Sequence, residues 1–235
     1  MKKSVIISCI AVLFAFVAAF ALCAHALRAP QAVFSEADGS MKIVIDAGHG
    51  GMDGGVTGRT TGKKESDVNL LIALKLKAEL SDMGFDVTLT RKTQAGLYDT
   101  ATKGFKKRDM QRRKEIVEEA QPSLVISIHQ NFYPTQSVRG AQVFYNGENK
   151  GGERFAKTLQ GKLNELYAEK GVKARNATAA EYFMLQCTSA PSVIVECGFL
   201  SNPADERLLL DEAWQARIAK SVAAGILAYI SQDVS

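Results

Sequence analysis

The sequence lacks a strong charge imbalance, an internal repeat and a low-complexity tract. Its formal net charge is +4, and Lys2 and Lys3 alone supply two of those charges. So small an excess of basic residues gives no support to a nucleic-acid partner. A chain of 235 residues that is 46% hydrophobic fits one globular domain with an ample core, plus an N-terminal extension. We see no sign of a second domain, so a separate module for anchoring a substrate is not expected.

Charge is absent altogether from residues 4–24, directly after two lysines. This run and the A-x-A-like site at residues 24–26 resemble a secretory signal peptide. The run is also long enough to span a bilayer uncleaved. We expect residues 1–27 to be a signal peptide or a membrane anchor. Either would export the domain outside the cytoplasmic membrane, secreted or membrane-anchored. Residues 28–40 are predicted to be a linker and residues 41–235 the folded domain.

Cysteine is scarce in the folded domain. Cys9 and Cys23 lie in the N-terminal segment, which leaves Cys187 and Cys197. Export permits a disulfide between these two. Their spacing is weak evidence for one, and small buried apolar residues are the simpler interpretation. The question of a bridge stays open.

Short apolar runs alternate with segments of helical periodicity. This pattern is typical of an α/β fold with a mostly parallel sheet and helices on both faces. Strands are predicted at residues 42–46, 86–91, 124–128, 140–145, 182–185 and 192–195. Helices are predicted at residues 66–83, 108–120, 152–170 and 212–230. A cluster of basic residues in and just before the second helix is expected to form a solvated face: Lys106, Lys107, Arg108, Arg112 and Arg113.

Histidine is equally scarce in the folded domain: the chain has three, and one of them lies in the N-terminal segment. The other two, His49 and His129, each follow a short apolar strand, and so does Glu196. Because the carboxyl ends of parallel strands line one crevice, these side chains are expected to meet. Glu65 joins them from the end of the glycine-rich loop after His49. Two imidazoles and a carboxylate form a His₂Glu zinc set that leaves a position open for water, and the fourth group can shuttle a proton.

Each of these residues alone also has a structural interpretation. A lone histidine after a strand is often a hydrogen-bonded structural residue. A glutamate that begins a helix is favoured by the helix macrodipole. The joint placement favours a metal site, since both histidines of the domain would otherwise reach strand ends by chance.

Four segments together resemble the zinc-dependent N-acetylmuramoyl-L-alanine amidases. They are IDAGHGG at residues 45–51, Glu65, SIHQN at residues 127–131 and ECGFLSN at residues 196–202. The resemblance runs from about Met41 to Ile230. Gln130 is a small departure, since a smaller residue is commoner there.

The resemblance implies that His49, Glu65 and His129 bind one Zn²⁺ and that Glu196 is the catalytic glutamate. The implied reaction is hydrolysis, by zinc-activated water, of an amide in peptidoglycan. That amide joins the lactyl group of N-acetylmuramic acid to the L-alanine of the stem peptide. Glu196 would take the water proton and return it to the leaving nitrogen. Asn131 and Arg91 either orient the substrate or hold the loops at the strand ends, and both alternatives stay open.

Within the family, the chain is similar to the short sporulation and germination-specific type that modifies spore-cortex peptidoglycan. A single catalytic domain behind an export signal and the segment at residues 102–105 before a basic helix support this. Members controlled by an autoinhibitory helix carry an insertion after the second histidine. Here residues 132–139 leave no room for one.

Two other functions stay open at this point. One is a catalytically inactive peptidoglycan-binding or regulatory protein of the same fold, and the other is a zinc hydrolase of a different amide, such as a peptide cross-link. Seven glycines precede Glu65 in its loop, and glycine loses the most backbone entropy on ordering. We therefore expect the isolated domain to bind zinc weakly and an activating partner protein to pack on this loop.

Overall fold

The computed structural model describes residues 40–100 and 102–232, so the expected signal or anchor and nearly all of the expected linker lie outside the described residues. The strands are β1 (Lys42–Ala47), β2 (Asp86–Leu89), β3 (Leu124–Asn131), β4 (Gln142–Tyr145), β5 (Thr178–Ala179) and β6 (Ser192–Phe199). The helices are α2 (Glu65–Asp82), α3 (Phe105–Ala120), α4 (Lys150–Ala168), α5 (Pro203–Leu210), α6 (Glu212–Gln232) and the short 3₁₀ helix η1 (Phe183–Leu185). Within this part of the chain, no helix is long and apolar enough to cross a membrane.

The described strands form a six-stranded sheet in the order β2-β1-β3-β6-β4-β5. Strands β2, β1, β3 and β6 are parallel, β4 is antiparallel to β6, and β5 is parallel to β4. The predicted α/β fold with a mostly parallel sheet is therefore confirmed. The central strands are continuous apolar runs because both faces of the sheet are buried there.

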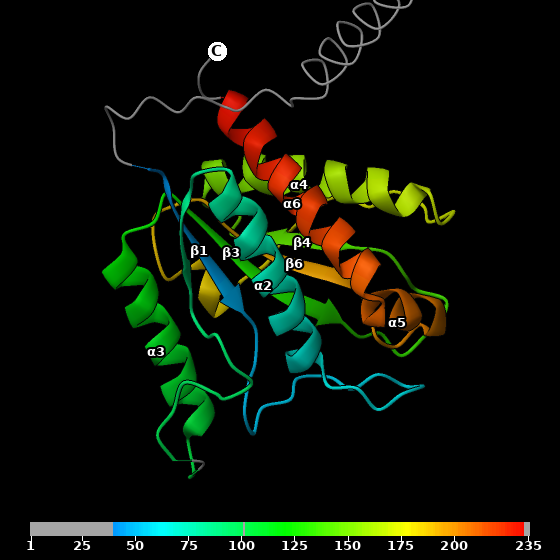
Figure 1. Cartoon of the computed structure of the whole chain (residues 1–235), viewed down its shortest axis with the longest axis horizontal. Coiled ribbons are helices and arrows are strands. Elements are labelled where there is room, and N and C mark those ends of the chain that lie inside the picture. Colours follow the sequence, from blue (N-terminus) through cyan, green and yellow to red (C-terminus); the bar gives the residue numbers. More distant parts are fainter. Residues whose placement is uncertain (1–39, 101, 233–235) are drawn as a thin grey trace, which may run out of the picture. The chain divides into compact units, whose positions relative to one another are not determined.

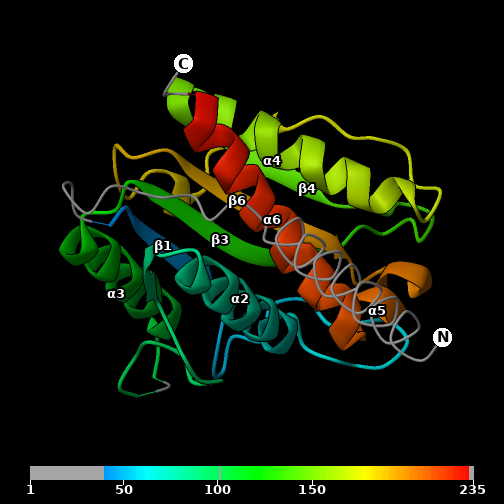
Figure 2. The ribbon, with the colours of Figure 1, turned by 45° about the horizontal axis from the view of Figure 1, so that its top comes forward.

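Helices cover both faces of the sheet, as predicted (Figure 1). The larger core lies between the sheet and α2, α4 and α6, which lie side by side in Figure 2. A smaller cluster of Val44, Val117, Val125, Met184 and Cys187 lies on the other face, where α3 and η1 pack. Within the described residues, Cys187 and Cys197 are buried and form no disulfide, which agrees with the simpler interpretation of both.

Three local predictions need correction. Residues 182–185 do not form a strand: the amide of Leu185 donates to the carbonyl of Tyr182 in the 3₁₀ turn of η1. Met184 and Leu185 are both buried in this turn, so a short apolar run that resembles a strand is here a buried 3₁₀ helix. Helix α5 was not predicted, because it has only eight residues. It begins at Pro203, after Asn202 caps the amides of residues 204 and 205.

The third correction concerns the strand ends. Strands β3 and β6 continue past the predicted ends, through Asn131 and Phe199. His129 and Glu196 therefore lie within these strands, not after them. They are direct partners across the parallel pair β3 and β6, so the two side chains still meet at one edge of the sheet.

Candidate active site

Steric contacts restrict which residues can form the turn after β1. His49 has a φ of 60°, a left-handed conformation that is uncommon for a residue with a side chain. The preceding residue must be glycine, because a Cβ at Gly48 would lie 2.2 Å from Cε1 of His129. The backbone just after β1 thus lies against the ring of His129, and the two imidazoles come together, one from this turn and one from β3.

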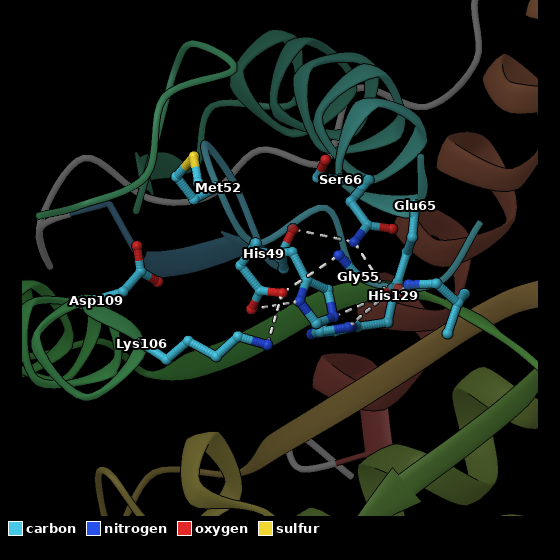
Figure 3. Close-up of polar contacts among 12 residues, drawn as sticks. His49, Met52, Gly55, Glu65, Ser66, Lys106, Asp109 and His129 are labelled. Atoms are coloured by element: carbon cyan, nitrogen blue, oxygen red, sulfur yellow. Dashed lines mark hydrogen bonds and ion pairs between the residues drawn. The ribbon is translucent and has the colours of Figure 1, made fainter. Parts of the chain in front are cut away.

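His49, Glu65 and His129 form one cluster (Figure 3). Oε1 of Glu65 lies 2.9 Å from Nδ1 of His129 and 3.3 Å from Nε2 of His49. One ligand atom from each residue lies within 4.8 Å of the others, and the two rings pack edge to face with centroids 5.1 Å apart. Among the described residues, this is the group of histidine, cysteine and carboxylate side chains that could hold a metal ion.

The electrostatics of the cluster favour positive charge at its centre. Burial alone would raise the pKa of Glu65, but hydrogen bonds and charge from both histidines hold it well below its usual range. Burial alone would lower the pKa of His49, but Glu65 and Asp53 outweigh it and raise that pKa to about 9. The carboxylate therefore remains ionised while only 3% exposed. A buried anion with two imidazoles is a donor set that fits a divalent cation with an open coordination position.

At Gly55, too, a side chain would collide with the candidate ligands. A Cβ there would lie 2.3 Å from Oε2 of Glu65 and 2.8 Å from Cδ2 of His49. The loop thus closes over two of the three candidate ligands with backbone alone. Its next amide, from Val56, donates to Oε2 of Glu65 at 2.9 Å and helps to fix the carboxylate.

Polar residues not predicted from the sequence hold the candidate ligands in place. Nδ1 of His49 lies 3.0 Å from Oδ2 of Asp53, and the ammonium of Lys106 lies 3.0 Å from Oδ1 of the same carboxylate. Lys106 reaches toward His49 from α3 in Figure 3, so it belongs to this site and not only to a solvated face. Nδ2 of Asn69 donates to Oε1 of Glu65 at 3.2 Å. Two signals in the sequence could have identified Asp53 and Asn69. Asp53 is a carboxylate four residues after His49, and Asn69 is an amide one helical turn after Glu65.

Glu196 lies on β6 beside His129 on β3. Burial raises the pKa of Glu196 to about 7, and the charge of Glu65 acts in the same direction. Its Oε2 is buried and has no hydrogen-bond partner among the residues that the structure describes. An unpartnered carboxyl oxygen next to three candidate ligands is the arrangement expected of a proton-transfer group and not of a structural one.

The structure also bears on Arg91 and Asn131. Arg91 is 3% exposed, and its guanidinium donates to backbone carbonyls, which matches the interpretation that it holds the loops at the strand ends. Asn131 ends β3 half-buried, and its side-chain oxygen accepts from the amide of Phe132 at 2.7 Å. Its carbonyl accepts from Leu200, so the backbone at this position joins the ends of β3 and β6.

The glycine-rich loop is tied to the domain at several points. The carboxylate of Glu206 on α5 accepts from the amides of Thr60 and Thr61 at 2.9 and 2.8 Å. The amide of Arg59 donates to the carbonyl of Leu200 at 3.2 Å. These contacts let the domain itself order the loop, without a partner, and weak zinc binding by the isolated domain stays a prediction. The short helix α5 contributes to this ordering of the loop through Glu206.

Comparison with known proteins now adds to the geometry. Residues 43–228 match the N-acetylmuramoyl-L-alanine amidase family. The chain belongs to this family. It is 35% identical over 194 residues to the germination-specific N-acetylmuramoyl-L-alanine amidase of Bacillus subtilis, covering 81% of this chain and 80% of that protein. It is 29% identical to the amidase AmiA of Escherichia coli, covering 81% of this chain and 76% of that protein.

Solved amidase structures share the fold. The CwlD amidase from Clostridioides difficile, solved in complex with the GerS lipoprotein, superposes with a TM-score of 0.78 at 32% identity. The match covers 82% of this chain and 99% of that chain. The amidase family named from the sequence motifs is thereby confirmed, and the chain is a hydrolase of this class. The family match spans all four residues of the candidate site.

Proposed function

We propose that this amidase binds one Zn²⁺ through His49, Glu65 and His129. With Glu196 as proton shuttle, it would hydrolyse the amide between the lactyl group of N-acetylmuramic acid and L-alanine in peptidoglycan. The observation that carries the proposal is the buried Glu65 carboxylate shared by two imidazoles. His₂Glu is a ligand set of catalytic zinc sites, which keep a position free for water or substrate.

The chain's own residues supply the remaining chemistry. When bound, zinc supplies Lewis acidity toward the amide carbonyl and lowers the pKa of water. Glu196 then accepts the proton of the attacking water and returns it to the leaving nitrogen, so that the stem peptide departs with a free amine. A pKa raised to about 7 by burial suits a group that must both accept and donate near neutral pH. The lactyl group is left with a free carboxylate in place of the amide.

We place this activity outside the cytoplasmic membrane, in the modification of spore-cortex peptidoglycan. The germination-specific relative from B. subtilis supports the cortex assignment. The uncharged N-terminal run supports export, with residues 1–27 as a cleaved signal or an anchor. A partner protein is supported by the C. difficile amidase, whose structure contains a lipoprotein. In the described chain, residues 132–141 between β3 and β4 hold no helix that could block the site.

The test combines zinc analysis with product analysis. The purified protein should contain zinc and should release peptides with a free alanine amine from sacculi, leaving free lactyl carboxylates detectable by mass spectrometry. His129→Ala should lose both zinc and turnover. Products cut at a peptide cross-link would identify a different amide hydrolase. Zinc binding without turnover, with or without a lipoprotein partner, would favour the inactive binding or regulatory protein. Unchanged zinc content in His129→Ala would contradict the ligand assignment.

A further inference from the structure

Two buried arginines hold the backbone that carries the candidate ligands. Nε of Arg91 donates to the carbonyl of Ala47 at 2.8 Å, and its Nη2 donates to the carbonyls of Gly48 at 3.0 Å and Ser66 at 2.8 Å. Its Nη1 donates to the carbonyl of Thr93 at 2.9 Å. One planar guanidinium therefore joins the residue before His49 to the residue after Glu65.

Arg113 on α3 is the second of these arginines. Its Nη1 donates to the carbonyl of Ala47 at 2.8 Å and its Nη2 to the carbonyl of His49 at 2.6 Å. Ion pairs with Asp46 and Asp109 balance its charge and fix its orientation. Three successive carbonyls, from Ala47 to His49, thus accept from guanidinium groups that are 3% and 1% exposed.

We call Arg91 and Arg113 together the arginine clamp, and the turn that they hold is strained at His49. His49 adopts a left-handed backbone, which persists only where the surroundings over-determine it. Nε2 of His49 lies 3.3 Å from Oε1 of Glu65, while carbonyls of the turn accept from the two arginines. Without the arginine clamp, the carbonyls of Ala47 and His49 would lose these donors and that of Gly48 would keep only Asn69. The turn could then relax to a conformation that moves the imidazole away from Glu65. A lysine could not replace either group, because an ammonium lacks the planar fork that reaches several separate acceptors.

We propose that Arg91 and Arg113 are positioning residues that set the metal affinity of the site, by keeping His49 in its left-handed conformation and in register with Glu65. The proposal rests on the proposed function, since it takes this cluster as the zinc site. Neither arginine touches substrate or metal in this scheme. Both act through the backbone of the candidate ligands.

The experiment compares Arg91→Lys and Arg113→Lys with the wild type as full-length proteins. Zinc is removed, and zinc affinity is measured by competition with a chromophoric chelator. We expect affinity to fall by about 10- to 100-fold in each variant, the usual effect of removing a group that supports a metal ligand. Excess zinc should restore kcat with KM unchanged, because the substrate contacts are intact. The control is Leu163→Ala, a fully buried core position on α4. It should lower the unfolding temperature while leaving zinc affinity at the wild-type value.

The outcomes separate the two proposals. Wild-type zinc affinity in both lysine variants, or an equal loss of affinity in Leu163→Ala, would overturn the positioning role while leaving the zinc site intact. A wild-type protein that binds no zinc would overturn the proposed function and this inference with it. If Arg113→Lys fails to fold because its two carboxylate partners are left unpaired, Arg91→Lys still decides the matter, since the hydrogen bonds of Arg91 go to backbone carbonyls.

Discussion

Gly55 and Gly62 offer a matched pair for testing the metal site. Both lie on the loop that follows His49, and both have a left-handed backbone, with φ of +67° and +70°. Alanine at either position should therefore lose about 1–2 kcal/mol of stability from its backbone conformation alone. Their surroundings differ. A Cβ at Gly62 would meet no atom within 4 Å, whereas at Gly55 it would lie 2.3 Å from Oε2 of Glu65.

The size of the expected effect follows from that distance. An ordinary contact needs more than 3.4 Å, so the carboxylate of Glu65 or the loop must move by about 1 Å. Disturbing the groups that hold a metal ligand usually lowers metal affinity by about 10- to 100-fold, and the larger value is about 2.7 kcal/mol of binding free energy. We therefore expect Gly55→Ala to weaken zinc binding about 100-fold, and Gly62→Ala to leave it unchanged.

Two measurements test this pair. Urea unfolding of the zinc-free proteins should show a loss of stability in both variants, and a larger loss in Gly55→Ala because its Cβ also displaces Glu65 or the loop. Added zinc should then raise the melting temperature of the wild type and Gly62→Ala much more than that of Gly55→Ala, because the stabilisation of the folded state by a ligand grows with the logarithm of its affinity. Zinc stabilisation of Gly55→Ala equal to the wild type would refute the assignment of Glu65 as a ligand held beneath this loop. Loss of zinc binding in Gly62→Ala would refute the claim that the effect is local.

Further changes give distinct readouts. Glu196→Gln should keep zinc and lose about 100-fold or more in rate, whereas Glu148→Gln, a control at an exposed carboxylate, should change neither; loss of zinc in the first would make Glu196 a ligand. Asp53→Asn should lower zinc affinity about tenfold, and an unchanged affinity would show that its contact with the first histidine has no effect. Acid should cost about 2 kcal/mol of unfolding free energy through Asp46. Burial would raise the pKa of Asp46, but Arg113 and two hydroxyl groups hold it at about 2 instead of 3.8. This contribution is present above about pH 4 and lost as pH falls toward 2. Urea melts of Asp46→Asn should lack it, and an identical acid profile in that variant would contradict the assignment.

The features that could be predicted from the sequence are those that depend on local pattern. Continuous apolar runs gave the central strands, because a strand buried on both faces needs no polar alternation. The order of β1, β3 and β6 then brought His49, His129 and Glu196 to one edge. The ends of β3 and β6 were placed too early, since polar residues at 129–131 and glycine at 198 look like the start of a loop. Hydrogen-bonded pairing between β3 and β6, which are distant in the sequence, extends both strands beyond their predicted ends.

The basic residues of α3 show why the rest of the site could not be predicted. Arg112 and Arg113 are neighbours in a charged helix, and both were expected on a solvated face. Arg112 is exposed and pairs with Glu115 and Glu119 on its own helix, as expected. Arg113 is 1% exposed, so for this residue the prediction was wrong. Its partner Asp46 lies 67 positions earlier, on β1.

A rotation of about 100° about the helix axis separates the side chains of Arg112 and Arg113. Only the packing of α3 against β1 decides which of them faces the sheet. An ion pair buried at that contact is stable only when its charges are matched and hydrogen-bonded. Arg113 meets that condition with Asp46 and Asp109, and its remaining donors meet the carbonyls of Ala47 and His49. The support of the candidate metal site is thus a product of tertiary contact, whereas its ligands were visible in the sequence.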